Sequence, residues 1–218
     1  MMDETKSLPI LTSEEIRVLG VLMEKSKTTP EYYPMTVNAI TVASNQKTSR
    51  KPVVQYDDQT VTLVLDTLKR KGLISTATGG SSRATKYKHN FAIVFPVLPA
   101  EVSILCLLML RGSQTPGELN TNSGRLYEFE SLDEVQSVLE RLSDPELPYV
   151  MQLPRRPGQK ETRYIHLLSG EPDLSQLEQQ TESSTKPASE LEQRLSKVEE
   201  ELSNLKADFD KLMKELMG

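Results

Sequence analysis

The sequence is poor in the residues that build disulfide-linked, metal-binding and many catalytic sites. Its 218 residues include one cysteine, two histidines and no tryptophan, and aromatic residues make up only 5%. A single cysteine excludes a disulfide framework within the chain and fits a reducing compartment. Because Cys106 lies in the apolar run SILCLLML, its expected role is that of a small buried hydrophobic residue.

Long apolar runs and targeting segments are also missing. No stretch approaches the roughly 20 apolar residues that a membrane-spanning helix needs. The opening residues, MMDETKS, lack the basic start and the apolar run of a signal peptide. We therefore expect a soluble, cytoplasmic protein that does not contact a membrane.

The net charge of −5 conceals a gradient along the chain. Residues 1–98 carry 13 Lys and Arg against 9 Asp and Glu, a net charge of +4. Residues 99–172 carry 7 against 11, and residues 173–218 carry 6 against 11. A polyanionic partner should therefore meet the first part of the chain.

The first part of the chain predicts three helices followed by a hairpin. A capping box, Thr12-Ser-Glu-Glu15, opens one helix, and Thr36 can cap a second. A third helix begins near Asp57-Asp58 and ends at Gly72, with an apolar stripe formed by Val61, Val64, Leu65 and Leu68. The turn GGSS and the basic segment RATKYKH follow it. Helices and hairpin in this order are typical of a winged helix.

The second part of the chain repeats this pattern. Residues 15–23 align with residues 101–109, Thr36 aligns with Thr115, and the third-helix stripe recurs at Val135, Val138, Leu139 and Leu142. The segments TKYKH and TRYIH also align and contain both histidines. Four matches in the same order predict a duplicated winged helix. The predicted fold class is therefore mainly α with small β wings (α+β), with one domain at 10–95 and another at 96–170.

The end of the chain has a different composition. Residues 171–189 are rich in Gln, Glu, Ser and Thr, which predicts a flexible linker. Residues 190–217 have apolar residues spaced alternately by four and three, which predicts a coiled-coil helix and a parallel homodimer. The dimerisation residues would be Leu191, Leu195, Val198, Leu202, Leu205, Phe209, Leu212 and Leu216. Alternatively, this helix packs back on its own domain.

Basic and amide side chains in the first domain suggest a surface for double-stranded DNA. Winged helices place their third helix in the major groove and the wing on flanking phosphates. The first domain also has extra residues around the loop NQKTSRK, and added loops on a rigid scaffold often carry function. The candidate nucleic-acid-binding residues are Asn45, Gln46, Lys47, Arg50, Lys51, Lys69, Arg70, Lys71, Arg83, Lys86 and Lys88.

Acidic and apolar residues on the third helices favour a second interpretation. Asp57 and Asp58 stand at the end that should approach the bases, where phosphates would repel them. Leu63 lies opposite the apolar stripe and suits contact with a protein better than contact with DNA. The alternative function is therefore a protein–protein interaction scaffold that uses the winged-helix surfaces and the coiled coil.

Patterns typical of enzymes are missing. The histidines occupy equivalent strand positions, which indicates a repeated structural role, and no cluster supplies the ligands of a metal site. The GGSS segment lies in a hairpin, without the strand-to-helix setting of a phosphate-binding loop. We expect no catalytic residues, no metal and no cofactor.

Two long segments resemble a known family. They are YPMTVNAITVASNQKTSRKPVVQYDDQTVTLVLDTLKRKGLI, followed by KYKH, and in the second domain LRGSQTPGEL with LPRRPGQKETRYIHLL. The chain resembles the YceH-like family of bacterial proteins over roughly residues 10–170. The resemblance implies a tandem winged-helix fold and implies no particular activity.

Overall fold

The computed structural model describes residues 8–77, 84–155, 161–172, 196–197 and 206. The chain forms two compact units, Met1–Glu171 and Pro172–Gly218. In the second unit, Ser196, Lys197 and Lys206 are helical and have exposed side chains. All eight predicted dimerisation residues lie outside the described residues, as does Arg83 of the predicted DNA surface.

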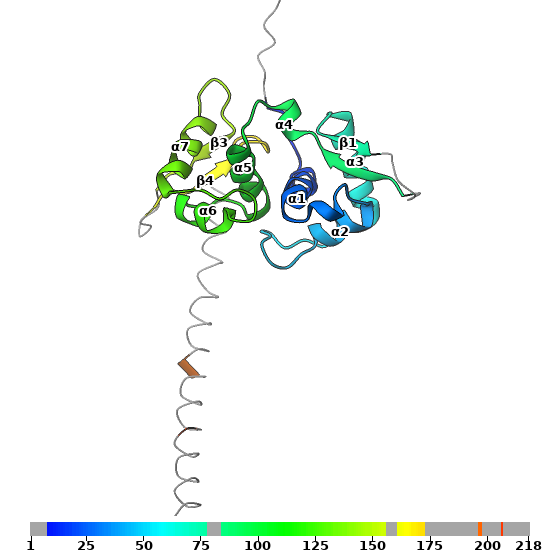
Figure 1. The fold of residues 1–218 in the computed structure, drawn as a ribbon, viewed down its shortest axis with the longest axis horizontal. Helices are drawn as coiled ribbons and strands as arrows, with labels where there is room; N and C mark the ends of the chain where they lie inside the picture. The colour runs from blue at the N-terminus through cyan, green and yellow to red at the C-terminus, as the bar shows by residue number, and fades with distance from the viewer. Residues whose placement is uncertain (1–7, 78–83, 156–160, 173–195, 198–205, 207–218) are drawn as a thin grey trace, which may run out of the picture. The chain divides into compact units, whose positions relative to one another are not determined.

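The first unit is mainly helical with two small sheets, which confirms the predicted α+β class (Figure 1). Its first half contains α1 (Ser13–Thr28), α2 (Val37–Ser44), α3 (Asp58–Arg70), β1 (Ile74–Ala77) and β2 (Lys86–His89). After α4 (Phe91–Val94), its second half contains α5 (Pro99–Arg111), α6 (Pro116–Ser123), α7 (Leu132–Leu142), β3 (Val150–Gln152) and β4 (Tyr164–His166). No helix in the described residues is both long and apolar enough to span a membrane.

Local sequence signals set the ends of the helices as predicted. Thr12 and Glu15 form the capping box of α1, with backbone-to-side-chain hydrogen bonds of 2.9 and 3.3 Å. Asp57 caps α3 by accepting a hydrogen bond of 2.8 Å from the Thr60 backbone N–H. Gly72 follows the C-terminal end of α3 with a φ of +73°, a conformation that costs glycine little.

The two halves repeat each other in backbone pairing as well as in element order. In the first, β1 pairs antiparallel with β2, and Met35 pairs with Tyr87. In the second, β3 pairs antiparallel with β4, and Gln114 pairs with Tyr164. In each half, the residue just before the threonine cap of the second helix therefore pairs with the tyrosine of the last strand.

One continuous hydrophobic core runs through both halves. The predicted stripes of α3 and α7 are buried, including Val61, Leu65, Val135 and Leu139, each 0% exposed. Helix α1 is buried on more than one face, because Val18 and Val21 are 0% exposed as well as Leu19 and Leu22. Helix α5 lies beside α1 at the centre of the unit, with α3 and α7 farther out on opposite sides (Figure 1).

The central α1–α5 contact brings together equivalent positions of the repeat. Gly20 aligns with Cys106, and the Cys106 thiol donates a hydrogen bond of 3.4 Å to the Gly20 carbonyl oxygen. A contact between equivalent residues is the mark of an isologous interface, with an approximate twofold axis passing nearby. The α1–α5 contact between the two halves shares this feature of an isologous interface.

Two short elements were not predicted. Residues Pro30–Tyr32 form a 3-10 helix in the connection between α1 and α2. Helix α4 occupies the connection between the halves, and its four residues are too few to give a periodic pattern. It is fixed by Phe91, which is 0% exposed and packs on Phe95 at a ring-centroid distance of 4.8 Å.

We predict that Gly20→Ala destabilises the first unit by about 1–3 kcal/mol. An added Cβ would lie 3.0 Å from the Leu110 Cδ2 atom, so the Leu110 side chain would have to shift by a few tenths of an ångström within a packed core. This loss should outweigh the gain of about 1 kcal/mol that alanine gives over glycine inside a helix. Urea unfolding of the full chain measures the change.

Gly124→Ala is the matched control, because no atom lies within 4 Å of its added Cβ and its φ is −50°. It should leave the free energy of unfolding equal or slightly higher. If Gly20→Ala were as well tolerated as Gly124→Ala, close α1–α5 packing would not be required.

Candidate nucleic-acid interface

Asn45 and Gln46, predicted to contact DNA, instead hold their own loop in place through hydrogen bonds. The Asn45 side chain donates to the Tyr56 carbonyl oxygen and accepts from the Tyr56 backbone N–H, both at 2.8 Å. Gln46 accepts a hydrogen bond of 2.9 Å from Arg50. Because the N–H₂ and C=O ends of the Asn45 carboxamide each bond the Tyr56 backbone, the side chain is held against the protein in this structure.

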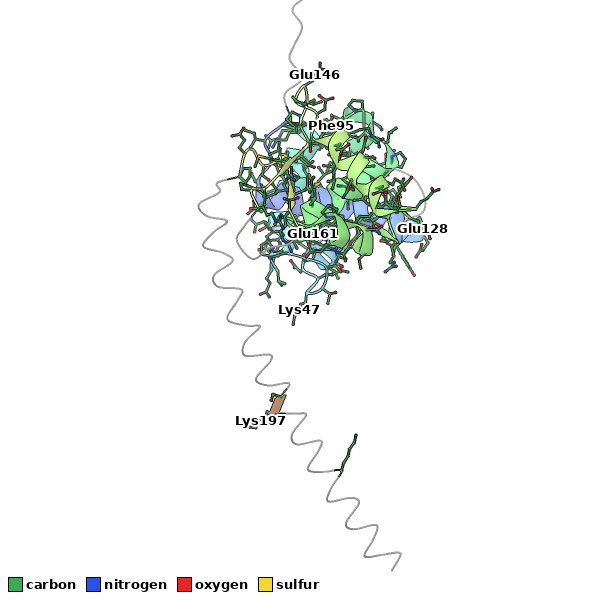
Figure 2. All side chains as sticks on the ribbon, turned by 90° about the vertical axis from the view of Figure 1, so that its left-hand side faces the viewer. Lys47, Phe95, Glu128, Glu146, Glu161 and Lys197 are labelled. Atoms are coloured by element: carbon green, nitrogen blue, oxygen red, sulfur yellow. The ribbon has the colours of Figure 1, made fainter. Side chains whose placement is uncertain are left out.

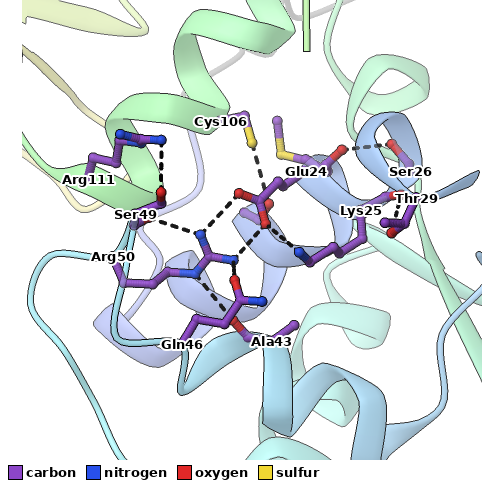
Figure 3. Close-up of polar contacts among 12 residues, drawn as sticks. Glu24, Lys25, Ser26, Thr29, Ala43, Gln46, Ser49, Arg50, Cys106 and Arg111 are labelled. Atoms are coloured by element: carbon purple, nitrogen blue, oxygen red, sulfur yellow. Dashed lines mark hydrogen bonds and ion pairs between the residues drawn. The ribbon is translucent and has the colours of Figure 1, made fainter. Parts of the chain in front are cut away.

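Arg50 is an internal structural residue and not an exposed phosphate ligand. It is 6% exposed, and its guanidinium donates twice to Glu24, at 3.0 and 2.6 Å. It also donates to the Ala43 and Ser49 carbonyl oxygens and to Gln46 (Figure 3). All five N–H donors of an arginine are thereby engaged. The sequence prediction for Arg50 is corrected on this point, because the loop folds inward onto α1.

Lys71 also makes contacts within the protein. Its ammonium group lies 2.6 Å from Glu15 Oε2 and donates to the Ile10 carbonyl oxygen at 3.2 Å. Burial raises the pKa of Glu15, but hydrogen bonds from Lys71, Thr12 and Thr67 outweigh it, so the pKa lies below its usual value. Lys71 thus joins the end of α3 to the start of α1.

The other described cations of the predicted DNA-binding set lie on the surface of the first half. Lys69 and Arg70 are exposed in the last turn of α3, and Lys88 is exposed on β2. Lys86 is half-buried on the same strand, opposite Ala77. Lys47 and Lys51 are exposed in the loop after α2, and Lys47 projects outward (Figure 2). None of these six side chains has an ion pair within the described part of the chain.

Carboxylates and one apolar side chain share the outer face of α3 with these cations. Asp57 caps α3, and Asp58 is its first residue. Asp58 accepts a hydrogen bond of 2.5 Å from the Thr41 hydroxyl. Asp66 is exposed one turn before Arg70. Leu63 is 61% exposed, as the spacing predicted, and it borders two shallow hollows.

The two histidines occupy equivalent positions and are held neutral. Desolvation by burial lowers the pKa of His89 and of His166 to about 4. His89 Nε2 lies 3.2 Å from the Ser26 hydroxyl, and its Nδ1 accepts from the Phe91 backbone N–H. His166 Nδ1 is buried without a partner in the described residues. A hydrogen-bonded core imidazole therefore describes His89 but not His166.

A polar cleft between the halves was missed by sequence reasoning. The loop that holds Arg50 also lies against α5, where the Lys51 backbone N–H donates to the Leu110 carbonyl oxygen at 2.8 Å. Arg111 donates to the Ser49 hydroxyl at 3.0 Å (Figure 3). It also donates to the Asn122 side chain at 2.7 Å. The cleft beside these contacts has a volume of about 460 Å³. The extra loop was the available signal, but its position against α5 required the structure.

Chemical groups typical of metal or thiol catalysis are not assembled in the described residues. No three His, Cys, Asp or Glu side chains there are grouped so that they could hold a metal ion. Burial raises the pKa of the Cys106 thiol, which keeps it protonated. The thiol is a packing group between α1 and α5.

We predict that Arg50→Ala lowers the free energy of unfolding by about 3 kcal/mol, because it leaves the buried Glu24 carboxylate without its two strongest donors. Lys47→Ala is the matched control, since it removes the same charge from an exposed position in the same loop. It should change stability by less than about 0.5 kcal/mol. Equal effects of the two variants in urea unfolding would show that the Arg50 contacts do not stabilise the fold.

Comparison with known proteins places the chain in a family. A family model described as "Protein of unknown function, DUF480" matches residues 11–159. The UPF0502 protein YceH of Salmonella paratyphi A is 42% identical over 211 residues, covering 94% of this chain and 97% of the relative. A UPF0502 protein of Shewanella sp. (strain ANA-3) is 42% identical over 215 residues, covering 94% of this chain and 99% of the relative. A UPF0502 protein of Opitutus terrae is 48% identical over 172 residues, covering 78% of this chain and 75% of the relative.

The first two matches are longer than the family resemblance seen in the sequence, which ended near residue 170. A match covering 94% of 218 residues must continue well into the segment that follows Glu171. The similarity therefore includes part of the predicted linker and coiled-coil segment. The chain belongs to the UPF0502 (YceH-like) family.

Proposed function

We propose that each half of the first unit is a winged helix and that the first half binds the phosphate backbone of double-stranded DNA. In this proposal the protein is not an enzyme, and residues 190–217 join two copies as a coiled coil. The order of three helices and a two-stranded sheet in each half supports the winged-helix assignment. The isolated Met35–Tyr87 and Gln114–Tyr164 bridges join the segment before the second helix to the last strand of each half, which also suits this fold.

The observation that carries the DNA proposal is the set of exposed or half-buried cations around the hairpin of the first half, none of which has an ion pair in the described residues. Lys69 and Arg70 end α3, and the chain enters β1 only a few residues later. Lys88 lies opposite Ser75 on the paired strand, and Lys86 lies opposite Ala77. These four side chains have no carboxylate partner in the described residues, so their charges remain available to phosphates.

The same geometry favours contact with the backbone over reading of the bases. The Asn45 side chain hydrogen-bonds to the Tyr56 backbone through its N–H₂ and its C=O. Asp57 and Asp58 lie at the start of α3. Phosphate contacts position a protein on DNA without carrying sequence information. We therefore expect binding that depends strongly on salt and weakly on sequence.

We predict that Lys86→Ala combined with Lys88→Ala weakens duplex binding on all sequences alike. In a plot of the logarithm of affinity against the logarithm of salt concentration, the slope should become shallower by up to about two units, one for each lost phosphate contact. Fluorescence anisotropy of the full chain with random-sequence duplex DNA across a salt series measures both quantities.

A charge-matched control is Lys197→Ala with Lys206→Ala, which removes two exposed cations from the second unit. Light scattering of this variant shows whether oligomeric state has changed. The proposal fails if the wild-type chain does not bind DNA at low salt, or if the control weakens binding as much as the Lys86 and Lys88 variant.

The exposed Leu63 favours a second candidate function, a protein–protein interaction scaffold. A leucine that is 61% exposed contributes little to its own fold, and the hollows beside it are lined by Thr60, Val64 and Thr67 on one side and by Asp66 and Arg70 on the other. Apolar side chains with polar neighbours are common in the contact surfaces of protein partners.

On the scaffold proposal, Leu63→Asp removes partner binding and leaves the stability of the isolated protein nearly unchanged. Leu63→Met is the matched control, because it keeps the apolar surface and should retain the partners. Quantitative affinity purification of the wild type and both variants from the native cell measures the difference. Partners that remain bound to the Leu63→Asp variant would exclude this face as the contact surface.

A further inference from the structure

The polar cleft between the halves has walls from both of them. Lys25 and Thr28 of α1 line it together with the loop that contains Lys47. The opposite wall includes Arg111 at the end of α5 and Arg125 just after α6. At about 460 Å³, its volume is in the range of small-molecule sites.

Positive charge predominates in this cleft. Four cationic side chains line it, and the one carboxylate among the lining residues is Glu24. That carboxylate accepts two hydrogen bonds from Arg50 and lies 3.3 Å from the Lys25 ammonium group (Figure 3). The charge of Glu24 is therefore already balanced, and the other cations face the cleft without a compensating acid in its described lining.

Arg111 is the most informative of these cations. Its two described hydrogen bonds go to Ser49 and Asn122, which are uncharged, and it has no ion pair in the described residues. Three of its five N–H donors are left over from these contacts. Burial lowers its pKa, which shows that the guanidinium is partly removed from water, although it stays charged. The Glu24 carboxylate attracts Arg111 but already binds Arg50 and Lys25, so a bound anion would give this partly desolvated cation a partner of its own.

Thr28 supplies an independent observation. The residue lines the same cleft, and its buried hydroxyl oxygen has no hydrogen-bond partner in the described residues. Buried hydroxyl groups normally have a partner. A ligand oxygen in the cleft would provide one.

We propose that the cleft binds a small phosphate-bearing anion, held by Lys25, Lys47, Arg111 and Arg125. Phosphate is the chemistry that suits an arginine fork combined with lysine ammonium groups. Duplex DNA is too wide to enter a cleft of this volume, so the ligand is a small molecule. Because its donors come from both halves, the ligand strengthens the contact between them.

The test is isothermal titration calorimetry of the full chain with sodium tripolyphosphate, with orthophosphate as a second probe, at an ionic strength held constant with sodium chloride. The expected result is saturable binding of tripolyphosphate to the wild type. Lys47→Gln combined with Arg125→Gln should weaken it at least tenfold, which is the loss of about one charged hydrogen bond. Both side chains are exposed and make no described hydrogen bond, so the fold is retained.

Lys69→Gln combined with Arg70→Gln is the matched control, since it removes the same charge outside the cleft. Its affinity for tripolyphosphate should stay within about twofold of the wild type. The proposal is overturned if the wild type binds no tripolyphosphate, or if the control loses as much affinity as the cleft variant.

Measuring duplex DNA binding of the same variants distinguishes this proposal from the DNA-binding function. The Lys86→Ala and Lys88→Ala variant should bind tripolyphosphate like the wild type even where its DNA binding is lost. If the cleft variant weakens DNA binding while the wild type binds no tripolyphosphate, the cleft cations serve the duplex and the small-ligand proposal is wrong.

Discussion

The close approach of α1 and α5 is the contact on which the first unit depends. It is possible because position 20 has no side chain, and the Leu110 side chain occupies the space that a Cβ would take. Since α1 carries core residues on its other faces as well, this one contact joins the two halves into a single hydrophobic core. The halves therefore cannot be treated as domains on a flexible connection.

The extra loop of the first half reinforces that contact. Arg50 ties it to α1 through Glu24, and the Lys51 backbone and the Ser49 hydroxyl tie it to α5. A buried, fully hydrogen-bonded arginine is costly to desolvate and stabilises only when its partners are all in place. The loop thus has a structural role at its base, and its exposed tip at Lys47 borders the cleft.

Sequence periodicity was sufficient to predict the helices, the repeated stripes and the caps, because these depend on residues close together in the chain. Val61, Val64, Leu65 and Leu68 are buried as the spacing predicted, and Asp57 and Gly72 end α3 as their chemistry predicted. Whether each cation is buried in an ion pair or exposed could not be predicted in this way. Arg50 and Lys47 stand three residues apart in one basic loop, yet one is buried against Glu24 and the other is exposed. Only the position of α1 relative to the loop decides between them.

The meeting of Gly20 with its own counterpart Cys106 has a consequence for how such a chain can diverge. Two identical subunits related by a twofold axis must change together, because every substitution appears on both sides of the interface. Once the two copies are fused in one polypeptide, each side can change alone. Here the first 98 residues carry a net positive charge and the next 74 a net negative one, and the polar cleft between the halves has different residues on its two walls. Fusion thus allows charge on one side of the unit and an asymmetric cleft, while α1 and α5 still meet at equivalent positions.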